Sequence, residues 1–190
     1  QARLVVLHAT VVNRHGKLVT NLDRDAFTVR EDGKPQSIAV FGRDDVPVSL
    51  GILIDNSGSM KDKRAQVEAA ALALVRASNP QDEVFVMNFA DEPHLDVPFT
   101  MNINQLESGI RRADAIGGTA MRDAVDAAID YLRAHATRDR RALLVVTDGN
   151  DNASVTPMAQ VRRKVTQAEA VIFAIGVTLA RSEEHTSELQ

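Results

Sequence analysis

A nearly continuous apolar run at residues 48–54 constrains the fold of this chain more than any other feature of its sequence. The run shows no alternation of apolar and polar side chains, so a strand here is buried on both of its faces. Such strands belong to parallel sheets whose two faces are covered by helices. The sequence therefore favours an α/β fold from about residue 47 onward.

The segment that follows this run alternates between helical and strand patterns. Apolar residues at i, i+3, i+4 and i+7 indicate helices, and short runs rich in β-branched residues indicate strands. The predicted helices span 60–78, 103–113, 119–135 and 157–167, and the predicted strands span 83–89, 95–99, 142–146 and 170–177. We expect Pro157 at the first position of its helix and 95–99 at a sheet edge, because Pro93 and Pro98 flank and interrupt it. This order predicts a doubly wound, mostly parallel, Rossmann-like sheet with helices on both faces.

Residues 1–46 have a different pattern and predict a small β arm before the α/β domain at 47–180. Strand character occurs at 4–12, 27–31 and 37–41, and Asp32-Gly33 is typical of a hairpin turn.

The last ten residues, 181–190, lack apolar periodicity and are similar to the translation of a common sequencing-library adapter. We interpret them as an artefactual tail and exclude them from the fold. The α/β domain is then expected to be truncated at its C-terminus, with its natural continuation beyond residue 180.

Composition excludes several classes of function. The net charge is −4 with no long Lys/Arg cluster, which argues against nucleic-acid binding. No apolar run approaches the roughly 18 residues of a membrane span. The chain has no Cys, so thiolate metal sites and thiol nucleophiles are absent.

Oxygen-bearing side chains gather in three loops that follow strands or precede helices. The first loop carries Asp55, Ser57 and Ser59, the second carries Thr119 after two glycines, and the third carries Asp148. Ligand sites of open parallel sheets lie beyond the carboxyl ends of the strands, where these loops fall. Hydroxyls and carboxylates without His or Cys suit a hard cation such as Mg²⁺. A shell with few carboxylates leaves the ion attractive to an outside anion, such as a carboxylate on a partner.

Simpler roles compete with this interpretation. Asp55, Ser57 and Ser59 can cap the following helix, Thr119 can cap its own helix, and Asp148 can be a turn residue. We interpret Asn150, Asp151 and Asn152 as a solvated loop and Asp91, Glu92 and His94 as a solvated turn.

The three loops together resemble the metal-ion-dependent adhesion site of von Willebrand factor type A domains. The resemblance rests on Asp-x-Ser-x-Ser at 55–59, Gly-Gly-Thr at 117–119 and Thr-Asp-Gly at 147–149. The sequence at 21–36 is also similar to the N-terminal arm of a related family described from acidobacteria. The resemblance implies six strands in the order 3-2-1-4-5-6 with the third antiparallel, of which this chain supplies five.

The resemblance also implies roles for the five site residues. Ser57, Ser59 and Thr119 would bind Mg²⁺ or Mn²⁺ directly, while Asp55 and Asp148 would hold its waters. The expected function is a protein-binding, adhesion-type module that captures an exposed Asp or Glu of a partner in an extracytoplasmic or secreted bacterial setting.

Two alternatives stay open at this point. One is a structural module whose site is unused. The other is an Mg²⁺-dependent phosphoryl-transfer or hydrolase enzyme, for which Lys61 and Lys63 are candidate phosphate-binding residues. Both lysines are predicted on the polar side of a helix start, which favours a module that is not an enzyme.

Overall fold

The computed structural model describes residues 7, 9, 11–15, 19, 21–42, 46–112, 116–149 and 151–177. The chain divides into two compact units, Gln1–Asp45 and Val46–Gln190. Most of the strand predicted at 4–12, and all of the tail at 181–190, lie outside the described residues.

The first unit contains a small antiparallel hairpin, as the Asp-Gly signal predicts. A 3₁₀ helix, η1 (Arg24–Ala26), precedes strands β1 (Val29–Glu31) and β2 (Lys34–Gln36). The turn residues Asp32 and Gly33 have φ values of 49° and 78°. Positive φ at both positions is what a tight two-residue hairpin turn requires.

The strand predicted at 37–41 is wrong, because these residues belong to no strand in the structure. The Phe41 ring instead packs against the Phe27 ring, with centroids 5.3 Å apart. Strand propensity reports a preference for a half-buried surface, and an aromatic contact can satisfy that preference without a sheet partner.

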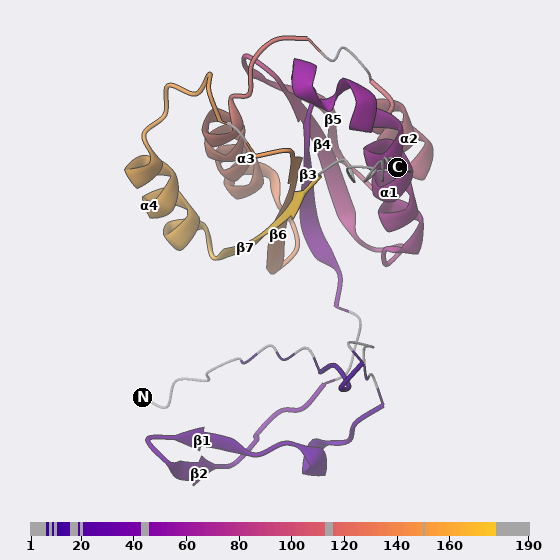
Figure 1. The fold of residues 1–190 in the computed structure, drawn as a ribbon. Helices are drawn as coiled ribbons and strands as arrows, with labels where there is room; N and C mark the ends of the chain where they lie inside the picture. The colour runs from indigo at the N-terminus through magenta and orange to yellow at the C-terminus, as the bar shows by residue number, and fades with distance from the viewer. Residues whose placement is uncertain are drawn as a thin grey trace, which may run out of the picture. The chain divides into compact units, whose positions relative to one another are not determined.

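The second unit is built on a five-stranded sheet in the order β5-β4-β3-β6-β7 (Figure 1). The strands are β3 (Val48–Asp55), β4 (Glu83–Phe89), β5 (Pro93–Thr100), β6 (Arg140–Thr147) and β7 (Ala170–Gly176). β5 pairs with β4 antiparallel, and the other neighbours pair parallel. The predicted mostly parallel sheet is confirmed, as is the edge position of β5.

Helices cover both faces of this sheet and explain the apolar run at 48–54. α1 (Arg64–Ala77) and α2 (Ile103–Ile110) pack on one face, and α3 (Met121–His135) and α4 (Met158–Ala168) pack on the other (Figure 1). Ile52 and Ile54 belong to the first core and Leu53 to the second. Successive residues of β3 therefore point into opposite apolar layers, which is why the strand shows no polar alternation.

Two predicted helix starts differ from the structure. The chain enters α1 through a 3₁₀ helix, η2 (Gly58–Lys63), rather than as one α-helix from residue 60. Pro157 has ψ of 140° and is the N-cap of α4, so it lies one position before the predicted one. The type of helical winding at a terminus is set by local contacts that a periodicity pattern does not record.

Contacts between segments also shorten two predicted helices. α2 ends at Ile110 rather than at 113, and the Arg64 guanidinium donates hydrogen bonds to the carbonyl oxygens of Ile110 and Arg112. The helix predicted at 119–135 begins at Met121. The residues before it, 116–120, form a loop.

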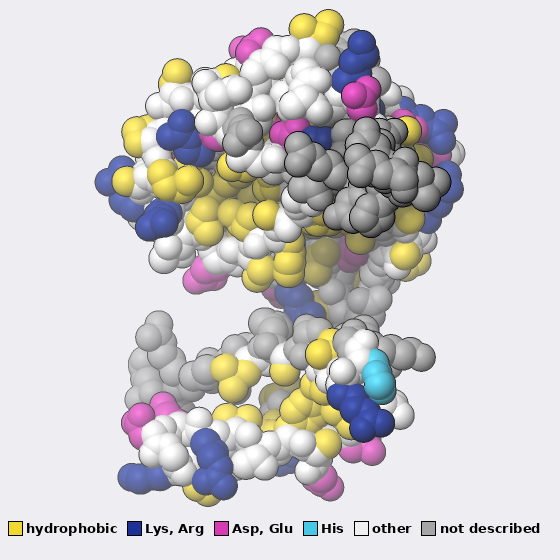
Figure 2. Space-filling view, viewed as in Figure 1, with side chains coloured by type: hydrophobic (Ala, Val, Ile, Leu, Met, Phe, Trp, Pro, Cys, Tyr) yellow, Lys and Arg dark blue, Asp and Glu magenta, His cyan; other side chains and the backbone are white. Residues whose placement is uncertain are grey.

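β7 is the last strand on its side of the sheet and exposes apolar side chains. Val171, Phe173 and Ile175 are 56%, 56% and 48% exposed. Figure 2 shows hydrophobic side chains gathered over this strand. No element within the described part of the chain covers this face of β7.

A buried carboxylate holds the amino ends of the central strands together. Glu83 Oε1 accepts hydrogen bonds from the Ser49 hydroxyl at 2.5 Å and from the Thr137 backbone N–H at 2.6 Å. Its Oε2 accepts a third from the Thr137 hydroxyl at 2.6 Å. Burial acts to raise the pKa of Glu83, but these hydrogen bonds outweigh it and hold the pKa below its ordinary value of 4.5.

Replacing the Glu83 carboxylate should lower the free energy of unfolding and should make that free energy depend less on pH. A carboxyl whose pKa is lowered by folding stabilises the protein above its unfolded pKa of 4.5, and this stabilisation is lost as pH falls through the lower folded value. Glu83→Gln should therefore lower the free energy of unfolding by about 1–3 kcal/mol at pH 7. Urea unfolding should show the difference shrinking below about pH 4.5, whereas the exposed Glu92→Gln should match the wild type throughout. An equal loss at pH 7 and pH 3 would contradict this assignment.

Candidate metal site

Two of the three predicted loops leave the sheet side by side at its carboxyl edge. β3 ends at Asp55 and its parallel neighbour β6 ends at Thr147. Because Ile54 pairs with Val146, the next residue of each strand lies at the same level of the sheet. This is the edge at which open parallel sheets bind their ligands.

Asp55 is fully buried, with an exposed fraction of 0%, and both of its carboxylate oxygens are held. Oδ1 accepts a hydrogen bond from the Ser57 backbone N–H at 2.9 Å, and Oδ2 accepts one from the Thr147 hydroxyl at 2.6 Å. A carboxylate has about four acceptor sites, so two remain for a water or an ion. The carboxylate is thus fixed in one orientation with acceptor capacity to spare.

The spacing of two serine hydroxyls fits a hard cation. Ser57 Oγ and Ser59 Oγ lie 3.1 Å apart. Two neighbouring ligands of an octahedral Mg²⁺, each about 2.1 Å from the ion, are separated by about 3.0 Å. The pair can therefore occupy adjacent positions of such a shell with little movement.

The glycine loop lies against the first loop and against the turn after β4. The Gly58 backbone N–H donates to the Gly117 carbonyl oxygen at 3.1 Å, and the Gly118 N–H donates to Asp91 Oδ1 at 2.7 Å. Gly117 has φ of 97°, and a Cβ on Gly118 would lie 3.1 Å from that Asp91 oxygen. Both glycines are therefore required by the close approach of these loops.

Thr119 is buried and is held through its backbone. Its N–H donates to Asn152 Oδ1 at 2.8 Å, and its carbonyl oxygen accepts from the N–H groups of Asn152 and Ala153. Among the described residues, no hydrogen bond uses the Thr119 hydroxyl, which leaves this oxygen available to a ligand.

Asp148 forms an ion pair with Lys63, which the sequence predicts on the polar side of a helix start. Lys63 Nζ donates to Asp148 Oδ2 at 2.8 Å, and the two side chains are only 13% and 9% exposed. Burial acts to raise the pKa of Asp148, but Lys63 and the Ser59 hydroxyl outweigh it and hold the pKa below its usual value. Asp148 is therefore ionised at neutral pH and in contact with the first loop.

A second ion pair ties the third loop to the start of α3. Asp151 Oδ2 accepts from the Arg122 backbone N–H at 2.8 Å and from the Ser154 hydroxyl at 2.8 Å, and it lies 3.1 Å from Arg122 Nε. Asp123 accepts in turn from the backbone N–H groups of Val155 and Thr156. The loop between β6 and α4 is thus anchored at several points.

These contacts extend or correct three sequence interpretations. Asp91 lies in an exposed turn, as predicted, but its carboxylate also holds the glycine loop. Asp151 and Asn152 are not merely loop solvation, since they accept hydrogen bonds from Arg122 and Thr119. Lys63 is not a solvated side chain at a helix start, since it is largely buried beside Asp148. The sequence carries no signal for Asp91 or Asn152, because their partners are backbone N–H groups that every residue except proline offers.

The structure joins three of the predicted residues through hydrogen bonds, Asp55 with Ser57 and Ser57 with Ser59, and the Ser59 hydroxyl helps to lower the pKa of Asp148, the fourth. Thr119 is linked to them through its own loop. Within the described ranges, no group of three or more His, Cys, Asp or Glu side chains is arranged to hold a metal. The candidate site is correspondingly rich in hydroxyls.

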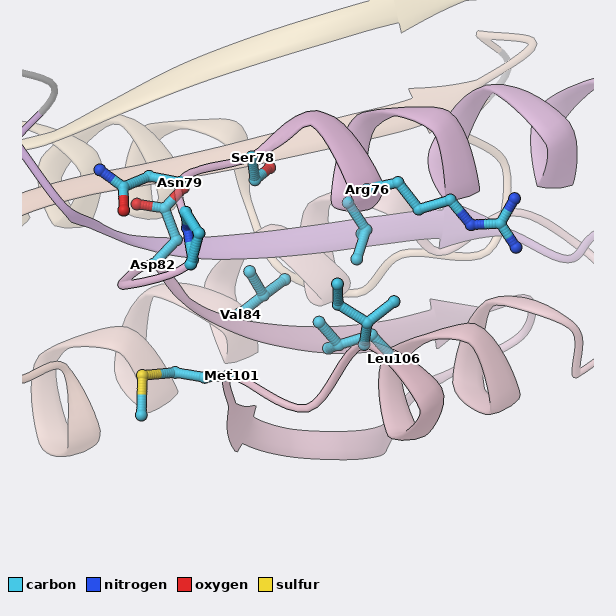
Figure 3. Close-up of a pocket in the computed structure, with 10 residues that line it drawn as sticks. Arg76, Ser78, Asn79, Asp82, Val84, Met101 and Leu106 are labelled. Carbon is cyan, nitrogen blue, oxygen red and sulfur yellow. The ribbon is translucent and has the colours of Figure 1, made fainter.

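A shallow pocket lies at the opposite end of the sheet (Figure 3). Its lining includes Asp82 and Val84, at the amino end of β4, together with Met101 and Leu106. It is separate from the candidate metal site, which lies at the carboxyl ends of the strands.

Residues 50–150 match the family model of the von Willebrand factor type A domain, and this match covers more than half of the chain. The chain therefore belongs to the von Willebrand factor type A domain family, and its five-stranded sheet is the core of that fold. A comparison with curated proteins found no match.

Solved structures from several bacteria share the fold. Three N-terminal domains of the type V pili tip protein Mfa5 from Porphyromonas gingivalis are 23% identical, with a TM-score of 0.51, over 55% of this chain and 20% of that chain. The conserved hypothetical protein BatB from Bacteroides thetaiotaomicron is 20% identical, with a TM-score of 0.60, over 70% of this chain and 67% of the BatB chain. The pilus adhesin SpaC from Lactobacillus rhamnosus GG is 12% identical, with a TM-score of 0.60, over 74% of this chain and 26% of the SpaC chain.

These TM-scores show a common fold, and at identities of 12–23% the likeness shows the fold alone. The chain spans only about a fifth of the length of the Mfa5 chain and about a quarter of the SpaC chain. Among the described residues, none of the helices combines the length and the apolar character needed to cross a membrane.

Adding a methyl group at Gly118 should disturb the loops around the site. The new Cβ would lie 2.8 Å from Asn152 Oδ1 and 3.0 Å from the Ala153 Cβ, so the Thr119 contacts must shift. Gly118→Ala should cost about 1–3 kcal/mol of unfolding free energy in urea. At Gly176 a Cβ meets no atom within 4 Å, so Gly176→Ala should change stability by no more than about 0.5 kcal/mol. Equal effects of the two substitutions would contradict the close packing of the loops.

Proposed function

We propose that the second unit is a metal-ion-dependent protein-binding module that holds Mg²⁺ or Mn²⁺ and captures an Asp or Glu side chain of a partner protein. The observation that carries this proposal is the pair of hydroxyls, Ser57 and Ser59, 3.1 Å apart beside two buried carboxylates. When bound, the ion supplies a Lewis-acidic position at which an outside carboxylate can coordinate.

The residues of the chain have distinct roles in this proposal. The hydroxyls of Ser57, Ser59 and Thr119 are the direct ligands, and Asp55 and Asp148 accept hydrogen bonds from metal-bound waters. Neutral hydroxyls leave the positive charge of the ion only partly compensated, so an anionic partner is favoured over a neutral one.

Binding is favoured over catalysis by the contacts of the described histidines of the second unit. His94 lies at the start of β5 near Asp96, and the ring of His135 packs at a tilt against Tyr131 at the end of α3, with ring centroids 4.5 Å apart. Neither ring forms a hydrogen bond with Ser57 or Ser59, as the general base of a serine nucleophile would.

An extracytoplasmic or secreted setting is part of the same proposal. The similar structures include a pili tip protein and a pilus adhesin. A module that captures acidic side chains through Mg²⁺ or Mn²⁺ suits a cell surface.

Metal binding should be visible as a change in thermal stability. A ligand of the native state stabilises it by mass action, by about 2.7 kcal/mol at a hundred times its dissociation constant. Mg²⁺ should therefore raise the melting temperature of the full chain by several degrees over the value in EDTA. Thr119→Val, which removes the buried hydroxyl and keeps the shape, should abolish most of this rise.

Thr166→Val in α4 is the matched control, because the exposed Thr166 hydroxyl only bonds the Arg162 carbonyl oxygen. It should keep the full response to Mg²⁺. A wild-type melt that is the same in Mg²⁺ and in EDTA would overturn the proposed metal site.

Capture of a carboxylate can be tested with peptides. One surface carries a mixed peptide library with a central Asp or Glu, and a second carries the same library with Asn or Gln in its place. The chain should be retained on the acidic surface alone, only with Mg²⁺ or Mn²⁺, and Thr119→Val should not be retained. Equal retention on the two surfaces, or retention in EDTA, would contradict a carboxylate captured through the metal.

A further inference from the structure

Lys63 is drawn toward the candidate metal site by the 3₁₀ winding of η2. A 3₁₀ helix has three residues per turn, so residues i and i+3 lie on the same side. Met60 is fully buried, and Lys63, three residues later, shares its side of η2. Lys61 is exposed. The two lysines of this short segment therefore lie in different environments.

The ammonium group of Lys63 is part of the electrostatics of the site. It lies 2.8 Å from Asp148 Oδ2, and the exposed fractions of 13% and 9% show that water screens the pair only partly. Asp148 is itself one of the five residues of the proposed site, directly after Thr147, whose hydroxyl donates to Asp55. Lys63 thus contacts a carboxylate of the proposed site.

The net charge of the candidate site is less negative than its two carboxylates alone would make it. Asp55 and Asp148 contribute two negative charges, and Lys63 offsets one of them. A divalent cation held by this loop would be repelled by the positive charge that Lys63 places beside Asp148, which opposes its binding. Without a metal, however, the same ammonium compensates a carboxylate whose burial would otherwise be costly.

We propose that Lys63 is a tethered cation that stabilises the metal-free site and weakens its affinity for Mg²⁺. This inference rests on the proposed function, since it assigns to Lys63 the tuning of the same site. Lys63 is a positioning residue, because it acts through Asp148 and is not itself a metal ligand.

The test measures Mg²⁺ affinity of the full chain by titration calorimetry for the wild type, Lys63→Met and Lys63→Arg. Removing the positive charge that lies beside Asp148 should tighten binding roughly tenfold, even with the screening of water. Lys63→Met should show that gain, whereas Lys63→Arg keeps the charge and should stay within about threefold of the wild type. Lys61→Met removes the exposed lysine and should also leave the affinity within about threefold, because exposed charges are well screened.

Thermal melts provide a second readout that a merely structural ion pair would not move. In EDTA, Lys63→Met should melt below the wild type, because Asp148 loses its partner. With saturating Mg²⁺ the gap should close, since the ion then compensates the carboxylate. A purely structural lysine would lower the melting temperature equally in both conditions. Lys63→Gln serves as a second neutral variant should Lys63→Met fail to fold.

The outcomes separate this inference from the proposed function. If the wild type binds Mg²⁺ and the neutral variants bind no more tightly, the role of Lys63 is wrong and the metal site stands. If neither the wild type nor the neutral variants bind Mg²⁺, both proposals are overturned. If only the neutral variants bind, Lys63 holds the site closed to the metal, which supports the inference in its strongest form.

Discussion

The hydrogen bond between the Thr147 hydroxyl and Asp55 Oδ2 joins the two strands around which the second unit is organised. It lies at the carboxyl edge of β3 and β6, in a fully buried position where an unpaired carboxylate would be costly. The carboxylate is fixed from both sides, by Thr147 and by the Ser57 backbone. The first loop takes its conformation from that fixed point, and Ser57 and Ser59 converge because the loop turns around it.

The remaining loops are joined to this one by polar contacts rather than by apolar packing. Gly117 accepts from Gly58, Asp91 holds Gly118, and Asn152 holds Thr119. Such hydrogen bonds depend on direction, so they fix the positions of side chains more sharply than hydrophobic contact does. The two apolar cores, one on each face of the sheet, supply the stability that lets these loops keep one arrangement. The sheet is therefore stabilised mainly by burial of apolar side chains, whereas the arrangement of the loops at the candidate site is fixed mainly by hydrogen bonds.

Sequence reasoning succeeded where a pattern was repeated over many residues. The buried strand at 48–54, the helix predicted over 119–135 and the order of elements each rest on several apolar positions, so one exception does not change the result. It failed where a single contact decided the outcome. Residues 37–41 form no strand, and the Phe41 ring packs on Phe27 instead, while α2 ends at Ile110, whose carbonyl oxygen accepts from the Arg64 guanidinium.

The sequence by itself determined the α/β class, the approximate position of each loop and which side chains carry hydroxyl or carboxylate oxygens there, because periodicity and composition are local properties of the chain. Only the tertiary structure decided which groups meet. Lys63 reaches Asp148 across 85 positions of sequence, and Thr147 reaches Asp55 across 92. These contacts depend on the parallel pairing of β3 with β6 and on the 3₁₀ winding of η2. No spacing rule within one segment records either of them, since both arise from the packing of one segment against another.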